Sequence, residues 1–235
     1  MSVAVVVVGA GRGRRLGGEV PKQYLPLAGP CALRRCIETF LAVPAIDAIV
    51  PVIHPDDEAL CRDALDGLDH HALREPVPGA ETRASSVRRG LEALAADAPG
   101  QVLIHDAARP FVPLSVVTDV IAALRGPAAT DGACAALRVV DTIWRAGEDV
   151  DTPPQIVSRE GLWRAQTPQG FDFAAILGAH RAHDNAATDD VAVAVAAGLR
   201  VRFVPGSEQN YKITGAADLE RAIADAKALD GVAVR

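Results

Sequence analysis

The feature that most constrains the fold is an unbroken run of apolar, mostly β-branched residues at positions 3–8, followed at once by a glycine- and arginine-rich segment at 9–18. A strand that is apolar at every position is typical of a central parallel strand buried on both faces. In open α/β sheets, ligands bind beyond the carboxyl ends of such strands. The beginning of the chain therefore predicts both an α/β fold and the sheet edge that holds the site.

Strand-like and helix-like segments alternate along the rest of the chain. The expected strands lie at 46–54, 102–105, 133–137 and 200–204, and the expected helices at 32–41, 55–65, 85–96, 114–125, 171–182, 189–197 and 216–229. This alternation predicts a Rossmann-like, mostly parallel twisted sheet flanked by helices. Residues 139–166 differ, because short β-like pieces at 142–144 and 155–157 surround polar turns and a Pro-Pro pair. We interpret them as a protruding β-arm of a single domain spanning 1–235.

Composition narrows the function classes. The 235 residues carry a net charge of -6, which argues against broad nucleic-acid binding but leaves room for a small anionic ligand held by local cations. The four cysteines have neither zinc spacing nor a disulfide framework, so we expect reduced thiols in a cytoplasmic protein. We expect no signal peptide, and no apolar run approaches the roughly 20 residues that span a bilayer.

The segment after the first strand reads Gly-Ala-Gly-Arg-Gly-Arg-Arg-Leu-Gly at 9–17. Glycines let the backbone and its N–H groups approach a ligand, and Arg12, Arg14 and Arg15 add positive charge, a combination that suits a triphosphate. A dinucleotide fingerprint would need a third glycine at position 14, and a P-loop would need Gly-Lys-Ser/Thr; the sequence has neither. A merely flexible surface loop is the remaining alternative.

Two further motifs point to the same sheet edge. Lys22, in Pro-Lys-Gln-Tyr-Leu, follows the arginine segment closely enough to reach the same phosphates. Asp106 follows a buried strand in His-Asp-Ala-Ala-Arg-Pro, where a carboxylate is well placed to hold Mg²⁺ together with substrate phosphates. Arg109 would meet a phosphate or orient Asp106. The alternative is a helix-capping aspartate with a salt-bridged arginine, and we expect His105 to be structural.

The second half adds scattered polar groups. Arg159 lies in the expected arm, and Lys212 follows a glycine loop. Thr188-Asp189-Asp190 begins a helix, where N-capping is the alternative to a functional role. Cations converging on one cleft would suit phosphoryl-type transfer, which depends on positioning and charge stabilisation.

In their order, these segments resemble the 2-C-methyl-D-erythritol 4-phosphate cytidylyltransferase family of the non-mevalonate isoprenoid pathway. The motifs cover nearly the whole chain: Gly-Arg-Gly-Arg-Arg-Leu-Gly (11–17), Pro-Lys-Gln-Tyr-Leu (21–25), Thr-Arg-x-x-Ser-Val (82–87), His-Asp-Ala-Ala-Arg-Pro-Phe (105–111), Val-Asp-Thr (140–142), Leu-Trp-x-Ala-Gln-Thr-Pro-Gln-x-Phe (162–171), Thr-Asp (188–189) and Asn-x-Lys-Ile-Thr (210–214). The ordered set, rather than any one motif, carries the resemblance.

The resemblance implies that CTP and methylerythritol 4-phosphate give the cytidine diphosphate derivative and pyrophosphate. It implies four catalytic cations: Arg15 and Lys22 would stabilise the charge that develops on the triphosphate, and Arg159 and Lys212 would position the methylerythritol phosphate. It places CTP at Ala10, Gly11, Gly13, Arg14, Ala80, Glu81, Ser86, Asp106 and Ala107, with Mg²⁺ near Asp106. It places the acceptor at Arg109, Thr142, Arg159, Thr188, Asp189 and Lys212.

The resemblance also implies a homodimer whose β-arms reach across the two-fold axis, so that Arg159 acts in trans. Three departures from the family pattern affect finer contacts. Gly9 stands where alanine is common, Ala-Ser-Ser at 84–86 stands where Gln-Asp-Ser is usual, and Gln209 stands where some members have aspartate. None removes a phosphate-handling cation.

Three alternatives stay open. A ribitol 5-phosphate cytidylyltransferase shares the fold and most motifs, although Leu-Trp-Arg-Ala-Gln at 162–166 and the Ala-Ala pair at 107–108 resemble the methylerythritol enzymes. A sugar-1-phosphate nucleotidyltransferase shares the glycine-rich segment, but the contexts of Arg159 and Lys212 argue against it. A non-catalytic nucleotide-binding module is the third, since fold alone does not establish activity.

Overall fold

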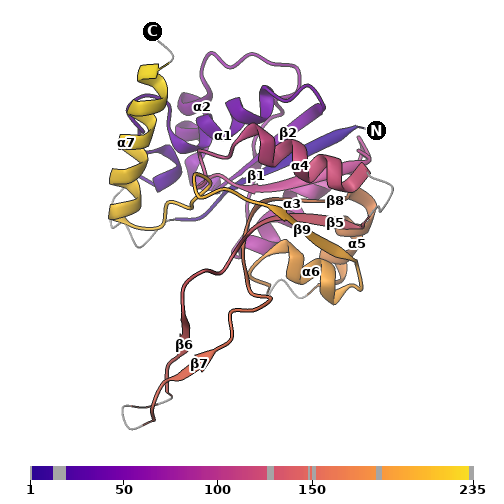
Figure 1. The fold of residues 1–235 in the computed structure, drawn as a ribbon. Coiled ribbons are helices and arrows are strands. Elements are labelled where there is room, and N and C mark those ends of the chain that lie inside the picture. The colour runs from indigo at the N-terminus through magenta and orange to yellow at the C-terminus, as the bar shows by residue number, and fades with distance from the viewer. Residues whose placement is uncertain are drawn as a thin grey trace.

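The structure is a computed structural model that describes residues 2–12, 20–125, 130–147, 149, 152–183 and 187–232. Within them, seven strands form one sheet in the order β3-β2-β1-β4-β8-β5-β9 (Figure 1). The strands are β1 Val3–Gly9, β2 Ile46–Ile53, β3 Val77–Pro78, β4 Gln101–Asp106, β5 Gly132–Arg138, β8 Trp163–Asp172 and β9 Val201–Pro205. Strand β8 runs antiparallel to β4 and β5, and the other pairs are parallel. The mostly parallel α/β sheet predicted from the sequence is confirmed.

Strand β1 lies inside the sheet, between β2 and β4. Its apolar run is buried on both faces: Val3, Val5 and Val7 belong to one core cluster, and Ala4 and Val6 belong to the other. This double burial explains why the strand is apolar at every position rather than at alternate ones.

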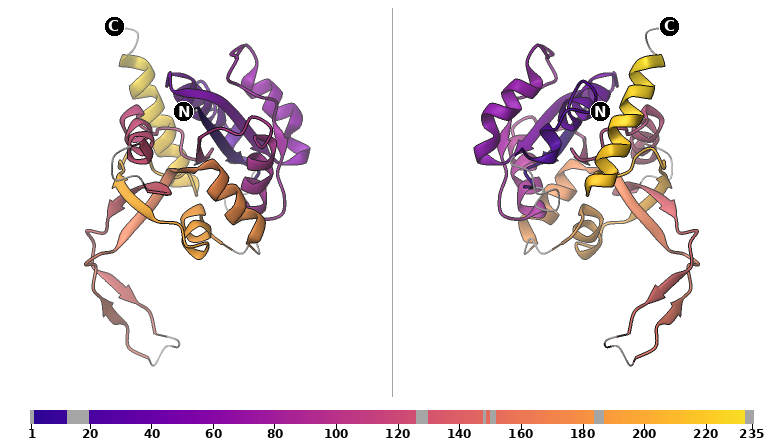
Figure 2. Two further views of the ribbon diagram at one scale, coloured as in Figure 1. Left: turned by 90° about the vertical axis from the view of Figure 1, so that its right-hand side faces the viewer. Right: turned by 90° about the vertical axis from the view of Figure 1, so that its left-hand side faces the viewer.

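Helices cover both faces of the sheet (Figures 1 and 2). The first core cluster packs the sheet against α1 Ala32–Leu41, α2 Glu58–Leu65 and α4 Leu114–Arg125. The second packs it against α3 Arg83–Ala93, α5 Phe173–Ala182 and α6 Asp190–Ala196. The long helix α7, Ala216–Val232, packs through a small separate cluster that includes Leu27 and Ile213. The described residues also form two single-turn 3₁₀ helices, η2 Lys22–Tyr24 and η3 Pro55–Asp57.

The β-arm is a two-stranded antiparallel sheet of β6, Ile143–Arg145, and β7, Gln155–Val157. It projects away from the body of the molecule (Figures 1 and 2). Its large apolar side chains are exposed, with Trp144 at 58% and Ile156 at 67%. The predicted excursion from the sheet is confirmed as a protruding arm.

The sequence prediction is wrong at β8, because it extended the arm to residue 166 and expected a helix from residue 171. The chain instead re-enters the sheet at Trp163, and α5 begins at Phe173. Pro168, Gly170 and the glutamines of this segment are poor strand formers, and proline argues against a central strand. The structure accommodates them with an irregular register, in which residues 166–168 of β8 lie opposite the single residue Ala135 of β5. The short strand β3 was also not predicted.

In the part of the chain that the structure describes, no helix is long and apolar enough to cross a membrane.

Candidate active site

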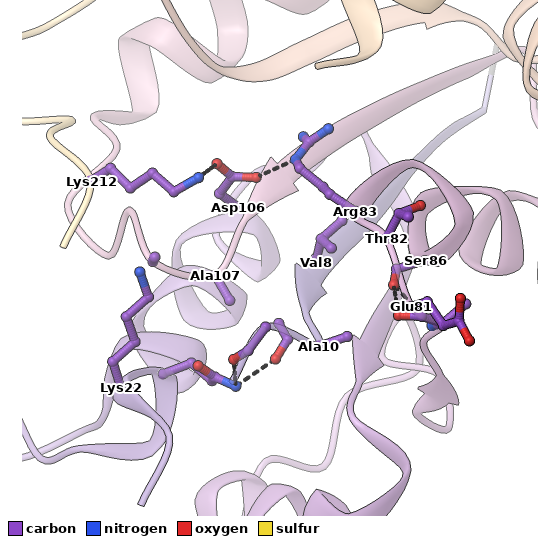
Figure 3. Close-up of a pocket in the computed structure, with 15 residues that line it drawn as sticks. Val8, Ala10, Lys22, Glu81, Thr82, Arg83, Ser86, Asp106, Ala107 and Lys212 are labelled. Carbon is purple, nitrogen blue, oxygen red and sulfur yellow. Dashed lines mark hydrogen bonds and ion pairs between the residues drawn. The ribbon is translucent and has the colours of Figure 1, made fainter. Parts of the chain in front are cut away.

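A pocket of about 220 Å³ lies at the carboxyl ends of β1 and β4, the edge predicted from the sequence (Figure 3). Its lining joins five parts of the chain: the end of β1 with the following loop, η2, the segment that enters α3, the end of β4, and Lys212. The predicted site residues that line it are Ala10, Gly11, Lys22, Ala80, Glu81, Ser86, Asp106, Ala107 and Lys212. Gly13, Arg14 and Arg15 lie outside the described residues.

The glycine-rich loop is held by Gln23. Its buried side-chain amide donates hydrogen bonds to the carbonyl of Gly9 at 2.5 Å and to that of Gly11 at 3.2 Å. Arg12 forms ion pairs with Asp56 and Asp57 of η3 and does not line the pocket. Gln23 thus fixes the path of the loop beside the pocket.

The opposite wall is built at the start of α3. The Ser86 hydroxyl accepts a hydrogen bond from the Ala80 N–H at 2.9 Å, and Thr82 caps the helix in a reciprocal capping box with Ser85. The two walls touch at Gly79, where a Cβ atom would lie 2.4 Å from the Cβ of Ala10. Only glycine fits this close approach.

Asp106 is the electrostatic centre of the pocket (Figure 3). Its Oδ1 accepts from Nε of Arg83 at 3.0 Å, and its Oδ2 accepts from Nζ of Lys212 at 2.7 Å. Burial by itself would raise the pKa of Asp106, but the charges of Arg83 and Lys212 outweigh it and hold that pKa well below its usual range. Asp106 is therefore an ionised acceptor at the end of β4, and the alternative that it caps a helix is wrong.

Lys22 reaches the same place from η2. Its Nζ donates to the carbonyl of Ile213 at 2.5 Å, directly beside Lys212 in sequence. Two lysines that are 190 positions apart in the chain thus meet at one pocket.

The loop that carries Lys212 is fixed by buried hydrogen bonds. The Asn210 side chain is fully buried and donates to the carbonyl of Thr167 at 2.7 Å. The Arg109 guanidinium donates to the carbonyl of Asn210 at 2.7 Å, and its Nε lies 4.0 Å from Asp106. Arg109 does not line the pocket, so its predicted contact with substrate stays a prediction.

His105 is buried beneath this loop. One ring nitrogen pairs with the Thr167 hydroxyl at 3.0 Å and the other with the carbonyl of Arg109 at 3.1 Å. Burial lowers the pKa of His105 to about 4, so the ring is neutral at pH 7. These contacts agree with the structural role expected for it.

The remaining acceptor-side residues do not line the pocket. Thr142 and Arg159 lie exposed on the β-arm, where the Arg159 guanidinium donates to the carbonyl of Val140. Thr188 is exposed, and the Asp189 carboxylate caps α6 by accepting from the Ala192 N–H. Their predicted roles toward the acceptor stay predictions.

The sequence analysis did not select Arg83, although this residue joins Asp106 to a second carboxylate, that of Asp190. One signal was present: a cation in the first turn of a helix is disfavoured by the helix dipole unless carboxylates compensate it. Arg83 opens α3 and has two such partners.

Similarity to known proteins covers nearly the whole chain. The sequence model of the family described as "IspD: 2-C-methyl-D-erythritol 4-phosphate cytidylyltransferase" matches residues 3–227. A Cereibacter sphaeroides protein named 2-C-methyl-D-erythritol 4-phosphate cytidylyltransferase is 46% identical over 224 residues, which cover 94% of this chain and 96% of that protein. A Paramagnetospirillum magneticum protein named "Bifunctional enzyme IspD/IspF" is 51% identical, with 93% of this chain and 55% of the relative covered. The chain spans about half the length of such bifunctional relatives.

Solved structures agree with this. A 4-diphosphocytidyl-2C-methyl-D-erythritol synthase from Anaerococcus prevotii superimposes with a TM-score of 0.81 at 28% identity and covers 96% of this chain and 98% of that one. The 2-C-methyl-D-erythritol 4-phosphate cytidylyltransferase from Thermus thermophilus gives a TM-score of 0.76 at 30% identity and covers 97% of this chain and 100% of that one. With its family model matched from residue 3 to residue 227, the chain belongs to the 2-C-methyl-D-erythritol 4-phosphate cytidylyltransferase family.

Proposed function

We propose that this chain transfers CMP from CTP to 2-C-methyl-D-erythritol 4-phosphate, giving 4-diphosphocytidyl-2-C-methyl-D-erythritol and pyrophosphate for isoprenoid precursor synthesis. The observation that carries the proposal is the cationic pocket itself. Lys22 and Lys212 converge there beside the ionised Asp106, and the glycine-rich loop after β1 lines the same pocket. Family membership supplies the identity of the substrates.

In this reaction a phosphate oxygen of the acceptor forms a bond to the α-phosphorus of CTP. The bond from that phosphorus to the bridging oxygen of the β-phosphate breaks, and pyrophosphate leaves with the electron pair. The nucleophile is already an anion, so no covalent enzyme intermediate is needed. Lys22 and Lys212 stabilise the negative charge that develops, which is the main way enzymes catalyse such transfers. Asp106 orients Lys212 through the 2.7 Å contact.

CTP would lie along the two walls of the pocket. Backbone groups at Ala10, Gly11 and Ala107 suit the nucleotide's phosphates and sugar, together with Gly13, Arg14 and the catalytic cation Arg15 of the preceding segment. Cytosine would be selected by groups near Ala80, Glu81 and Ser86. Polar groups placed for one base reject another that leaves them unpaired.

Asp106 is also the residue that would hold Mg²⁺. Among the described residues, no group of three or more His, Cys, Asp or Glu side chains is arranged to hold a metal. A single carboxylate still fits Mg²⁺, which commonly takes one or two carboxylates and completes its shell with substrate phosphates and water. When bound, the ion would supply positive charge beside the phosphates.

Two features support a homodimer that completes the acceptor site. Arg159 and Thr142 lie on an arm outside the pocket of their own chain, and the arm exposes Trp144 and Ile156. We infer that the arm crosses to a second copy and presents Arg159 and Thr142 to its pocket, near Arg109, Thr188 and Asp189. Trp144→Ser should shift the sedimentation profile toward monomer, and a wild-type chain that is monomeric at assay concentration would refute the proposed dimer.

Four buried, free cysteines support a reducing, cytoplasmic location.

The activity is tested by pyrophosphate release with CTP and Mg²⁺, with methylerythritol 4-phosphate, ribitol 5-phosphate or glucose 1-phosphate as the acceptor. Release with methylerythritol 4-phosphate only is the expected result. Release with ribitol 5-phosphate only would keep the chemistry but change the pathway. Folded protein that binds CTP but releases no pyrophosphate with any of the three acceptors would overturn the proposal and indicate a binding module instead.

A further inference from the structure

The charged centre of the pocket extends into the protein beyond the residues that line it. Nη1 of Arg83 lies 2.8 Å from Oδ2 of Asp190, while Nε of the same guanidinium binds Asp106. Nε2 of His180 lies 3.2 Å from Oδ1 of Asp190. We call this row of side chains, His180–Asp190–Arg83–Asp106–Lys212, the ion chain.

The inner end of the ion chain is sealed from solvent and outside the pocket. Asp190 and His180 are both fully buried, and neither lines the pocket. Asp190 is also fixed through its backbone, because Oε1 of Gln169 accepts from the Asp190 N–H at 3.0 Å and from the Val191 N–H at 3.1 Å. The carboxylate that faces Arg83 is therefore held by the start of α6, by β8 and by His180 on α5.

The charges of the ion chain explain why a second carboxylate is useful there. Arg83 and Lys212 carry two positive charges, and Asp106 and Asp190 carry two negative ones. With Asp190 in place, Arg83 gives one edge of its guanidinium to each carboxylate, and Oδ2 of Asp106 stays with Lys212. Without the Asp190 charge, the planar fork of Arg83 is free to take both oxygens of Asp106 or to turn toward an incoming triphosphate.

We propose that Asp190 and His180 are positioning residues for nucleotidyl transfer, which hold Arg83 between two carboxylates so that Asp106 keeps Lys212 in its catalytic position. This inference rests on the proposed function of the pocket. Asp190 and His180 act through Arg83 and contact no substrate themselves.

The test is Asp190→Asn, which keeps the size of the side chain and removes its charge. We expect kcat/KM for CTP to fall roughly 10- to 100-fold, as for other outer-shell partners of a charged site. The change should lie in kcat and in KM for CTP, and KM for the acceptor should rise with them, because Lys212 is also placed at the acceptor.

A double-mutant cycle separates positioning from a general structural effect. Because Asp190 acts through Arg83, Asp190→Asn should cost little more when Arg83→Lys is already present. The matched control is Arg181→Gln, which breaks the ion pair of Arg181 with Glu92 between the same two helices, α5 and α3, at an exposed place away from the pocket. It should leave kcat and both KM values unchanged.

A kcat/KM of Asp190→Asn within twofold of the wild-type value would overturn the inference. So would a double variant whose fall in kcat/KM equals the product of the falls in Asp190→Asn and Arg83→Lys alone. Should Asp190→Asn not fold, His180→Gln replaces it in the cycle, with a smaller fall in kcat/KM expected and an unchanged kcat/KM contradicting the inference. A wild-type chain without turnover would reject the proposed function alone. The ion chain would then be tested by the calorimetric affinity for CTP, which Asp190→Asn should weaken. An unchanged CTP affinity would refute the inference.

Discussion

Two regions of the molecule hold their side chains in opposite ways. One is the β-arm, and the other is the sheet-end cluster, which consists of Lys22, Arg83, Asp106 and Lys212. The cluster draws on four distant parts of one chain, and all of its members are joined by short polar contacts to buried or half-buried groups. The arm is two short strands with exposed apolar side chains and an exposed Arg159. Under the proposed function, one chain would set the geometry for CTP by itself, whereas the acceptor side would need the arm of a second copy.

Lys212→Ala tests the role of the sheet-end cluster most directly. The substitution removes a preorganised cation and leaves Asp106 with Arg83 at 3.0 Å and Arg109 at 4.0 Å, so kcat/KM should fall about 10²–10³-fold. Steady-state pyrophosphate release measures it. Lys227→Ala, at an exposed position on α7, is the matched control and should have no effect. A fall of less than fivefold for Lys212→Ala would mean that the cluster is not the catalytic centre.

Arg159→Ala tests whether the arm contributes to binding of the acceptor. Losing a charged contact to the acceptor phosphate should raise KM for methylerythritol 4-phosphate about 10- to 100-fold, with KM for CTP nearly unchanged. Initial rates at varied acceptor concentration give this directly. Equal loss on both substrates would contradict the division between the two regions.

Mixing the two variants sharpens that result. If the arm acts in trans, dimers that join an Arg159→Ala subunit to a Lys212→Ala subunit contain one intact site, so an equal mixture should recover about a quarter of wild-type activity. No recovery after subunit exchange would place the arm in its own chain's site.

Gly79→Ala tests how closely the two pocket walls must approach. The added Cβ would lie 2.4 Å from the Cβ of Ala10, so one wall must move, and CTP affinity should weaken about tenfold. Calorimetry with CTP measures the effect. Gly178→Ala on α5 is the control, because nothing lies within 4 Å of the added atom and alanine favours a helix. Unchanged CTP affinity in Gly79→Ala would show that the walls are not in contact with nucleotide.

The last expected effect is on stability rather than on the reaction, and it concerns His105 beneath the sheet-end cluster. Its pKa is lowered from 6.5 to about 4, so the unfolded chain binds a proton more readily than the folded one between those values. The free energy of unfolding should therefore decrease as the pH falls from 6.5 to 4, by up to roughly 3 kcal/mol. Urea titrations of metal-free protein should show a shallower decrease in His105→Gln. An equal slope in both proteins would contradict the assignment of this pH dependence to His105.

Much of this fold could be predicted because local pattern and tertiary role agree. The apolar run of β1 and the bounds of α1 and α4 follow from periodicity, and the parallel sheet then predicts that the glycine-rich loop and Asp106 meet at one edge. That Lys22 meets Asp106 follows from that topology, whereas Lys212 was expected at the site from the family resemblance.

What could not be predicted depends on tertiary contacts that override local preference. Strand β8 contains Pro168 and Gly170 and is stabilised by its neighbours β4 and β5 rather than by its own propensity. Asp190 follows a capping aspartate and looks like an ordinary first-turn residue, and only the packing of α6 and α5 against α3 brings its carboxylate to Arg83. The Gly79 contact with Ala10 likewise joins segments that are separate in sequence.

The most direct test of the central claim follows the label from CTP. With CTP labelled at the α-phosphorus, Mg²⁺ and methylerythritol 4-phosphate, the label should appear in a cytidine diphosphate product that contains the acceptor. With CTP labelled at the γ-phosphorus, it should appear in pyrophosphate. Transfer of the γ-label to the acceptor, or release of the α-label as free CMP, would contradict nucleotidyl transfer by this chain.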